Sequence, residues 1–271
     1  MSVDVEATAV AINGAVKIVR DGAVGWVVLT RPGQINAIND DIRQGVPAAL
    51  ALLEGDCAVR AIAIRGEGER GFCAGADIKE KRGVETSLDV RKRIELSSWI
   101  DYLDRVSKPV VVAIHGYCMG GGLEFALAAD IRVAAPDAIL ALPETGLGLI
   151  PGGGGTQRLS RVVSPGHAMD MLLTGDRLDA AKALSIGLVS RVSLSSDSLL
   201  DEVSALAHKI AAKPPMASAF VKRAARASLE MELGAGLSLE RDLFSLLATT
   251  KDAKEAALAF GERRQPVFTG E

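Results

Sequence analysis

The organisation of this 271-residue chain follows from one stretch, Val110-Val-Val-Ala-Ile-His-Gly-Tyr-Cys-Met-Gly-Gly-Gly-Leu-Glu-Phe-Ala-Leu-Ala-Ala-Asp130. Its continuous apolar run Val110–Ile114 predicts a buried strand. Three glycines then allow a sharp change of direction, and the apolar segment 123–129 predicts a helix behind them. A strand that turns through glycines into a helix is typical of an α/β protein.

The glycines at the start of this helix also predict a site for an anionic oxygen. A helix that begins near Gly122 leaves its first N–H groups without intrahelical partners, and its dipole places partial positive charge there. Gly121 has no side chain, so a ligand can approach the backbone closely. Glu124 adds a carboxylate in the first turn. The alternative is an ordinary strand-to-helix turn in which Glu124 makes only a cap-like contact.

A second carboxylate, Glu144, follows in Leu140-Ala-Leu-Pro-Glu-Thr-Gly-Leu-Gly-Leu-Ile-Pro-Gly-Gly-Gly-Gly-Thr156. Apolar surroundings raise the pKa of a carboxyl toward values that suit acid–base catalysis near neutrality. The alternative is a solvated loop glutamate. The glycine run 152–155 resembles a phosphate loop, but neither the P-loop pattern nor a well-placed G-x-G-x-x-G occurs, so a nucleotide site is not favoured.

A third glycine-bearing loop is Gly71-Phe-Cys-Ala-Gly-Ala-Asp-Ile-Lys79, which follows a predicted strand at 61–65. It can present backbone N–H groups, with Lys79 available to a phosphate or carboxylate; an ordinary turn into a helix is the alternative. The three histidines are isolated in the sequence, and we expect each to be structural. No Ser/His/Asp motif and no zinc-type cluster of ligands is present in the sequence.

The composition narrows the classes of function. A net charge of −3 and only 4% aromatic residues argue against a nucleic-acid-binding surface, which needs basic and stacking side chains. The apolar runs are too short to span a membrane, and the first eight residues lack the basic region of a targeting peptide. Three cysteines without metal-ligand spacing are typical of reduced, intracellular thiols. We therefore expect a cytoplasmic protein with no nucleic-acid or membrane partner.

Strand-like and helix-like segments alternate in the first two thirds of the chain. The predicted strands are 26–30, 61–65, 110–114, 131–134 and 139–142, and the predicted helices are 40–53 and one long helix at 84–106. Beyond about residue 196 only helical segments follow, at 199–213, 216–233, 237–248 and 253–264. We therefore predict an α/β domain of ββα units over 1–197 and an all-α region over 198–271. The apolar faces of that region exceed what four short helices can bury among themselves.

Together these loops resemble the enoyl-CoA hydratase/isomerase (crotonase) family over roughly residues 15 to 268. The matching segments are Arg31-Pro-Gly-Gln-Ile-Asn-Ala37, Phe72-Cys-Ala-Gly-Ala-Asp-Ile-Lys79, Lys108-Pro-Val-Val-Val-Ala-Ile-His-Gly-Tyr-Cys-Met-Gly-Gly-Gly-Leu-Glu124, Pro143-Glu-Thr-Gly-Leu-Gly-Leu-Ile-Pro-Gly-Gly-Gly-Gly-Thr-Gln-Arg158, Leu173-Thr-Gly-Asp-Arg-Leu178, Ala183-Leu-Ser-Ile-Gly-Leu-Val189 and Ala259-Phe-Gly-Glu-Arg-Arg-Gln-Pro-Val-Phe268. Several ordered motifs at family-like spacing make the resemblance specific at the level of the family.

The resemblance implies a crotonase-like spiral of ββα units followed by a helical trimerisation region, in a homotrimer or a dimer of trimers. It implies an acyl-CoA thioester as substrate and neither a metal nor a redox cofactor. Two peptide N–H groups, which map to Ala76 and Gly121, would hold the thioester oxygen. With both glutamates in place, the implied reaction is hydration of a 2-enoyl thioester to a 3-hydroxyacyl thioester. Glu124 would activate water, and Glu144 would protonate C2.

Further positions match residues that contact CoA in the family. They are Gln34, Ile35, Ala37, Ala74, Asp77, Ile78, Lys79, Phe260 and Arg263; the last two match positions that close the pocket or reach CoA from a neighbouring subunit. Alternatives remain open. An isomerase of the family needs only the second acid, and the dienoyl isomerase branch carries an Asp where this chain has Gly152. A member that keeps the fold as a non-catalytic binding protein is a further alternative, against which the intact glutamates and the acidic net charge count.

Overall fold

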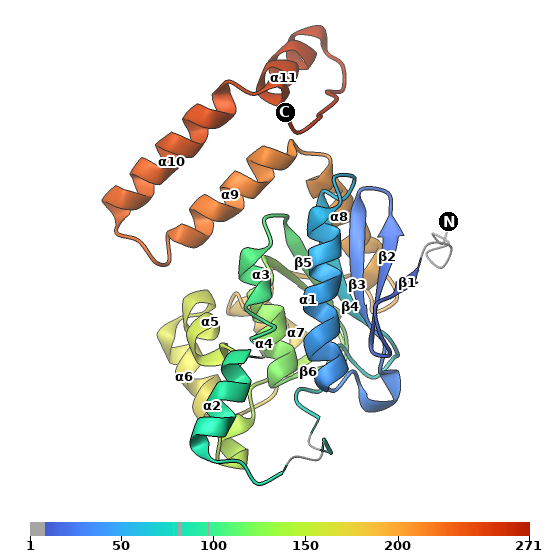
Figure 1. Cartoon of the computed structure of the whole chain (residues 1–271), viewed down its shortest axis with the longest axis vertical. Helices are drawn as coiled ribbons and strands as arrows, with labels where there is room; N and C mark the ends of the chain where they lie inside the picture. The colour runs from blue at the N-terminus through green and yellow to red at the C-terminus, as the bar shows by residue number, and fades with distance from the viewer. Residues whose placement is uncertain (1–8, 78, 81–82, 97) are drawn as a thin grey trace.

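A computed structural model of the chain describes residues 9–77, 79–80, 83–96 and 98–271. Its main element is a seven-stranded sheet in the order β1-β2-β3-β4-β5-β7-β10 (Figure 1). The first two pairings are antiparallel and the other four are parallel. The strands are β1 (Val10–Ala11), β2 (Val16–Asp21), β3 (Val24–Leu29), β4 (Ala61–Gly66), β5 (Val110–Ile114), β7 (Ile131–Ala134) and β10 (Arg191–Val192).

A smaller sheet lies at the carboxyl ends of the parallel strands. It consists of β6 (Tyr117–Met119), β8 (Ile139–Ala141) and β9 (Leu178–Asp179). β6 and β8 run parallel, with Met119 opposite Ala141, whereas β9 is antiparallel to β8. The turn at Gly116, with φ of +46°, allows the chain to pass from β5 of the large sheet into β6 of the small one.

Helix α1 (Asp40–Gly55) covers one face of the large sheet. It begins at Asn39, whose side chain accepts a hydrogen bond from the Ile42 N–H at 3.1 Å, and two aspartates follow in its first turn. Its buried positions recur at helical spacing and join the main apolar core, which also contains side chains of β3, β4 and β5. The predicted helix at 40–53 is confirmed.

Helix α8 (Leu199–Ala211) covers the opposite face. Leu199, Val203 and Ala207 form a second apolar core with the other side chains of the same strands, among them Trp26 and Val111. Both faces of the central strands are therefore buried, which explains why β5 is apolar at every position.

One predicted helix is wrong. Residues 84–106 do not form a single helix: the described part contains α2 (Ser87–Leu96) and the short α3 (Tyr102–Arg105), and residues 98–101 between them are not helical. α2 has no buried residue, whereas Trp99 and Ile100 are buried, and the Trp99 ring lies 4.9 Å from that of Phe125. Burial of these two side chains in the core outweighs the local helical spacing.

The remaining helices of the body are short. They are η1 (Pro32–Gln34), α4 (Gly121–Ala128), η2 (Glu144–Leu147), α5 (Gly155–Val162), α6 (Pro165–Thr174) and α7 (Ala180–Ser185). Predicted strands at 26–30, 61–65, 110–114, 131–134 and 139–142 correspond to β3, β4, β5, β7 and β8, and the helix predicted behind the glycines is α4.

The last three helices form an arm that extends from the body (Figure 1). They are α9 (Pro215–Ala227), α10 (Leu233–Ala248) and α11 (Lys251–Glu262). The four C-terminal helices occur where they were predicted, but α8 packs on the sheet. A domain boundary after residue 197 stays a prediction. Within the described ranges, no helix combines the length and the apolar character needed to cross a bilayer.

Candidate active site

The pairing of β6 with β8 brings the two predicted carboxylates to one edge. Met119 lies opposite Ala141 in a parallel register, so the residues that follow both strands leave the small sheet at the same end. After β6 the chain enters α4, and after β8 it enters η2, which begins at Glu144. The carboxyl ends of parallel strands are where α/β folds gather ligand-binding residues.

Gly120 forms the sharp turn before α4. Its φ of +52° and ψ of −126° suit glycine, and a Cβ there would lie 2.9 Å from Oε1 of Glu144. The absent side chain therefore leaves room for the Glu144 carboxyl directly beside the start of the helix. Gly121 is the first residue of α4, and its N–H group therefore has no acceptor within the helix, as expected.

The loop that contains Ala76 lies alongside β6. Cys73 forms an isolated parallel bridge with Cys118, and the Met119 N–H donates to the Cys73 carbonyl at 2.9 Å. This pairing brings the backbone nitrogen of Ala76 to 3.9 Å from the position that a Cβ on Gly121 would occupy. Among the described residues, neither Ala76 nor Gly121 donates its N–H to a protein acceptor. The N–H groups of Ala76 and Gly121, both without an acceptor in the described part of the chain, thus lie side by side at the N-terminus of α4.

Glu124 is buried one turn into α4, with 4% of its surface exposed. Its Oε1 accepts hydrogen bonds from the N–H groups of Gly153 at 2.7 Å and Gly155 at 2.8 Å, at the start of α5. Burial raises the pKa of the Glu124 carboxyl above its ordinary value, while these two donors act in the opposite direction. The glycine run 152–155 therefore holds a carboxylate of the chain itself and not a phosphate.

Glu144 has a different environment. Its Oε2 is buried and has no hydrogen-bond partner within the described part of the chain. Burial is the main cause that raises the pKa of Glu144, and the nearby charge of Glu124 adds to the rise. A buried carboxyl oxygen without a donor favours the protonated form, which suits a proton donor.

Asn36 is a positioning residue that the sequence reasoning did not single out. Its side chain is fully buried and donates to the carbonyls of Glu67 and Phe72, each at 3.0 Å, while its Oδ1 accepts from the Arg31 N–H at 2.9 Å. Its φ of +51° belongs to the left-handed region, which Asn tolerates better than most residues. Asn36 therefore ties the segment 31–37 to the loop of Ala76, and its place in the first matching segment is the only signal in the sequence.

The predicted CoA-contacting residues of the two N-terminal loops lie together. The Ala74 N–H donates to the Ile35 carbonyl at 2.8 Å, and the Ala37 N–H donates to that of Gln34 at 3.1 Å. Asp77 pairs with Arg31 at 3.0 Å, and this hydrogen bond is the main cause that lowers the pKa of Asp77. Ile78 lies outside the described residues.

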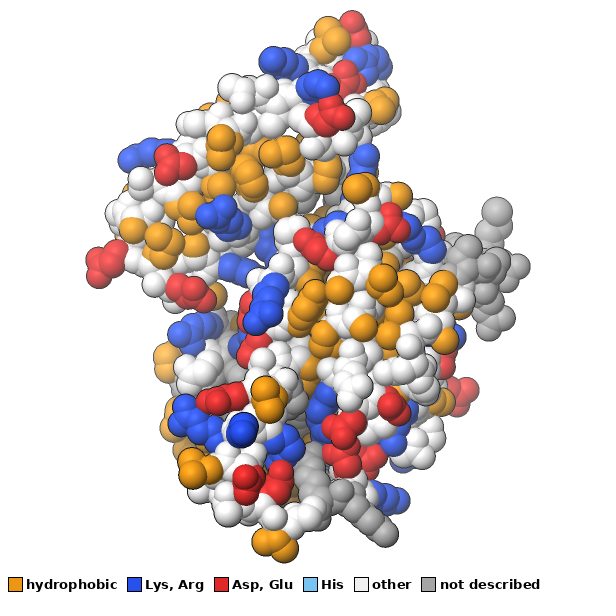
Figure 2. Space-filling view, viewed as in Figure 1, with side chains coloured by type: hydrophobic (Ala, Val, Ile, Leu, Met, Phe, Trp, Pro, Cys, Tyr) orange, Lys and Arg blue, Asp and Glu red, His pale blue; other side chains and the backbone are white. Residues whose placement is uncertain are grey.

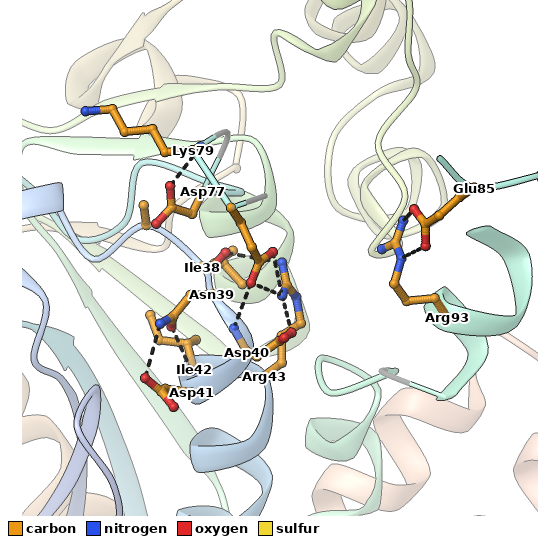
Figure 3. A network of polar contacts seen from close by, with 12 residues as sticks. Ile38, Asn39, Asp40, Asp41, Ile42, Arg43, Asp77, Lys79, Glu85 and Arg93 are labelled. Carbon is orange, nitrogen blue, oxygen red and sulfur yellow. Dashed lines mark hydrogen bonds and ion pairs between the residues drawn. The ribbon is translucent and has the colours of Figure 1, made fainter. Parts of the chain in front are cut away.

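Polar contacts join the start of α1 to the residues beside these loops (Figure 3). Arg43 on α1 binds both carboxylate oxygens of Glu80 at 3.0 Å, binds Asp40 at 2.6 Å, and donates to the Ile38 carbonyl at 3.2 Å. Figure 3 shows the side chain of Lys79 pointing away from this cluster.

The two predicted C-terminal contacts are not part of this site within one chain. Phe260 lies on α11 with 87% of its surface exposed, and Arg263 caps the end of that helix with φ of +56°. Figure 1 shows α11 in the arm, away from β6 in the body. Their contact with CoA stays a prediction.

The sequence profile of the family described as Enoyl-CoA hydratase/isomerase matches residues 20–271. The chain belongs to this family. It is 41% identical over 249 residues to the mitochondrial enoyl-CoA hydratase of Pongo abelii, an alignment that covers 92% of this chain and 84% of that protein. It is 36% identical over 246 residues to the short-chain-enoyl-CoA hydratase of Clostridium acetobutylicum, with 91% and 94% covered.

Solved structures give the same result for the fold. The crystal structure of the enoyl-CoA hydratase from Bacillus anthracis superimposes with a TM-score of 0.90 at 34% identity, covering 95% of this chain and all of that one. The predicted family, the crotonase fold and the expectation of an enzyme of this family are confirmed. The roles of individual site residues are not tested by these similarities and stay predictions.

Proposed function

We propose that the protein hydrates a 2-enoyl-CoA thioester to the 3-hydroxyacyl-CoA. The observation that carries the proposal is the meeting, at one end of the small sheet, of two unused N–H donors with two differently held carboxyl groups. Family membership supports an acyl-CoA substrate, and the names of the relatives support hydration in particular.

The N–H groups of Ala76 and Gly121 are assigned to the thioester oxygen. Addition to C3 of an enoyl thioester places negative charge on this oxygen in an enolate, and donors that are already oriented stabilise that charge without reorganising. One such donor contributes about 3 kcal/mol to the transition state. Gly121 also lies in the first turn of α4, where the helix dipole favours an anion.

The two glutamates are assigned to the protons. Glu124 takes one proton from water as the water oxygen bonds to C3, and Glu144 gives one proton to C2, so the elements of water are added across the double bond. Two carboxyl groups do both jobs when their surroundings separate their pKa values. The two N–H donors to Glu124 favour its ionised form, whereas the unpartnered Oε2 favours protonated Glu144. This chemistry requires neither a metal nor a redox cofactor.

The arm suggests that the site is completed in an oligomer. Hydrophobic side chains gather over α9 and α10 in Figure 2. The exposed large ones of the arm are Val221, Leu229, Met231, Leu233, Leu237, Phe244, Leu246, Leu258 and Phe260. An exposed apolar patch made of so many large side chains indicates a protein–protein interface. We propose a homotrimer or a dimer of trimers in which Phe260 and Arg263 of one copy reach the CoA loops of another.

The hydration proposal is tested with crotonyl-CoA, by following the loss of enoyl absorbance. We expect turnover by the wild-type chain. Repeating the assay over acyl chain length defines the substrate range. If no straight-chain 2-enoyl-CoA is hydrated while a 3-enoyl-CoA is converted to its 2-enoyl isomer, the protein is an isomerase and the hydration proposal is wrong.

A further inference from the structure

Helix α9 is joined to the body of the molecule by polar contacts. None of its thirteen residues is buried. Instead, the ammonium group of Lys222 lies 2.8 Å from Asp130 and donates to the Lys108 carbonyl at 2.8 Å. One turn later, Arg226 binds the other oxygen of Asp130 at 2.8 Å and reaches Asp104 at 3.2 Å. Two charged side chains of α9 therefore connect the arm to the body.

Arg226 also holds the end of the helix that carries the proposed oxyanion donor and Glu124. Its Nη2 donates to the carbonyl of Ala128, the last residue of α4, at 2.9 Å. Asp130, just beyond that end, accepts from the N–H of Val110 at the start of β5, at 2.8 Å. The guanidinium satisfies a carbonyl that α4 itself leaves without a donor, and it fixes the helix against the sheet.

Asp104 on α3 connects Arg226 to α5, the helix whose start holds the carboxylate of Glu124. It accepts from Arg158 at 2.9 and 2.6 Å, and Arg158 lies in the first turn of α5. The N–H groups that hold Glu124 belong to Gly153 and Gly155, directly at this end of α5. A continuous series of contacts thus runs from the arm through Asp104 to the backbone donors of Glu124.

We propose that Arg226 and Asp104 are positioning residues for the hydration reaction, which hold the end of α4 and the start of α5 so that the Gly121 N–H and the Glu124 carboxylate keep their relative geometry. The inference rests on the proposed function. The Arg226–Asp104 pair is partly exposed, with 30% and 44% of the two side chains accessible, and exposed ion pairs contribute little to folding stability. Turnover is more sensitive, because a displacement of about 1 Å at reacting groups can lower the rate by about a hundredfold.

The test compares Asp104→Asn and Arg226→Gln with a matched control, Arg223→Gln, which removes the same charge from the exposed side of α9. We expect kcat to fall about tenfold in the first two variants, with KM for crotonyl-CoA changed by less than about twofold. The control should match the wild type. Arg226→Lys keeps the charge and one donor, and it should restore part of the lost turnover. Sedimentation and thermal unfolding confirm that all variants remain assembled and folded.

Hydrogen exchange makes the result independent of turnover. Amide exchange in peptides covering 121–125 and 151–156 should be faster in Asp104→Asn and Arg226→Gln than in Arg223→Gln. If the wild type does not hydrate enoyl thioesters but exchange responds in this way, the proposed function fails and with it the role in hydration, whereas the structural part of the inference, that Arg226 and Asp104 hold these two segments, stands. If exchange and kcat are both unchanged in the two variants, the inference is wrong.

The pH profile separates positioning from plain electrostatics. In the described part of the chain, the charged groups that act on Glu124 are Glu144 from η2 and Arg158 from α5. Removing the charge of Asp104 should lower the pKa of Glu124 by electrostatics alone, whereas removing that of Arg226 should raise it. Loss of positioning weakens the two N–H bonds to Glu124 and raises its pKa in both variants. We therefore expect the acid limb of kcat/KM to move to higher pH in both; movement in opposite directions would overturn the inference.

Discussion

The start of α5 and the start of η2 each hold one carboxyl group of the candidate site, and they do so in opposite ways. Glu124 lies against two glycine N–H groups within 2.8 Å, at the positive end of a helix. The carboxyl group of Glu144 lies beside Gly120, in the turn between β6 and α4, and its Oε2 has no hydrogen-bond donor in the described part of the chain. Burial raises the pKa of both; the N–H groups of Gly155 and Gly153 act against this rise at Glu124, whereas at Glu144 only its own backbone N–H does so and the charge of Glu124 adds to the rise. Burial alone therefore does not determine a carboxyl group's role; the donors around it do.

The largest expected effect comes from replacing each carboxyl by its amide. Glu124→Gln and Glu144→Gln should each lower hydration turnover by about 10²–10⁴-fold, since proton transfer by one positioned group contributes on this scale. Thioester binding should persist, because the N–H pair and the CoA loops are unchanged. The measurement is kcat with crotonyl-CoA together with the Kd of a saturated acyl-CoA. Loss of binding in parallel with turnover would contradict the assigned roles.

An intermediate effect is expected from crowding each carboxyl without changing it. A Cβ at Gly120 would lie 2.9 Å from Glu144 Oε1, and one at Gly153 would lie 2.7 Å from Cδ1 of Ile100 and 3.0 Å from Glu124 Oε2. Gly120→Ala also suffers from the positive φ, so its unfolding temperature should fall as well. Both should lose about 10–100-fold in kcat, because small displacements of catalytic groups are costly.

Gly152→Ala is the matched control for these crowded variants, since a Cβ there meets nothing within 4 Å. It should keep nearly wild-type turnover in the same assay. A control as damaged as Gly153→Ala would mean that the flexibility of the glycine run, and not the space beside Glu124, is what the enzyme needs.

The sequence predicted much of this arrangement, because its main signals are local. The apolar run 110–114, the glycines behind it and Glu124 predict a strand, a turn and a helix within about twenty residues, and all three are present. What local patterns miss are the partners. The donors to Glu124 come from a loop about thirty residues further along, and nothing in the run 152–155 shows which anion it faces. Likewise the break before Trp99 follows from its packing on Phe125, which helical spacing does not reveal.

The smallest effect concerns stability, and it tests the contrast between the two carboxyl groups most directly. An unfolded glutamate titrates near pH 4.3, and the pKa of folded Glu144 lies above its ordinary value. Between these two pKa values the folded chain binds more protons than the unfolded chain, so this group lowers the free energy of unfolding as the pH rises. The loss is absent below about pH 4 and complete above the folded pKa.

Glu144→Gln cannot ionise and should therefore gain stability over the wild type between pH 4 and pH 8, measured as the shift in urea midpoint. Glu124→Gln should gain less, because it loses the charge-assisted bonds from Gly153 and Gly155. Equal gains for the two variants would show that the two donors do not distinguish the carboxyl groups, and the division into a base and an acid would lose its physical basis.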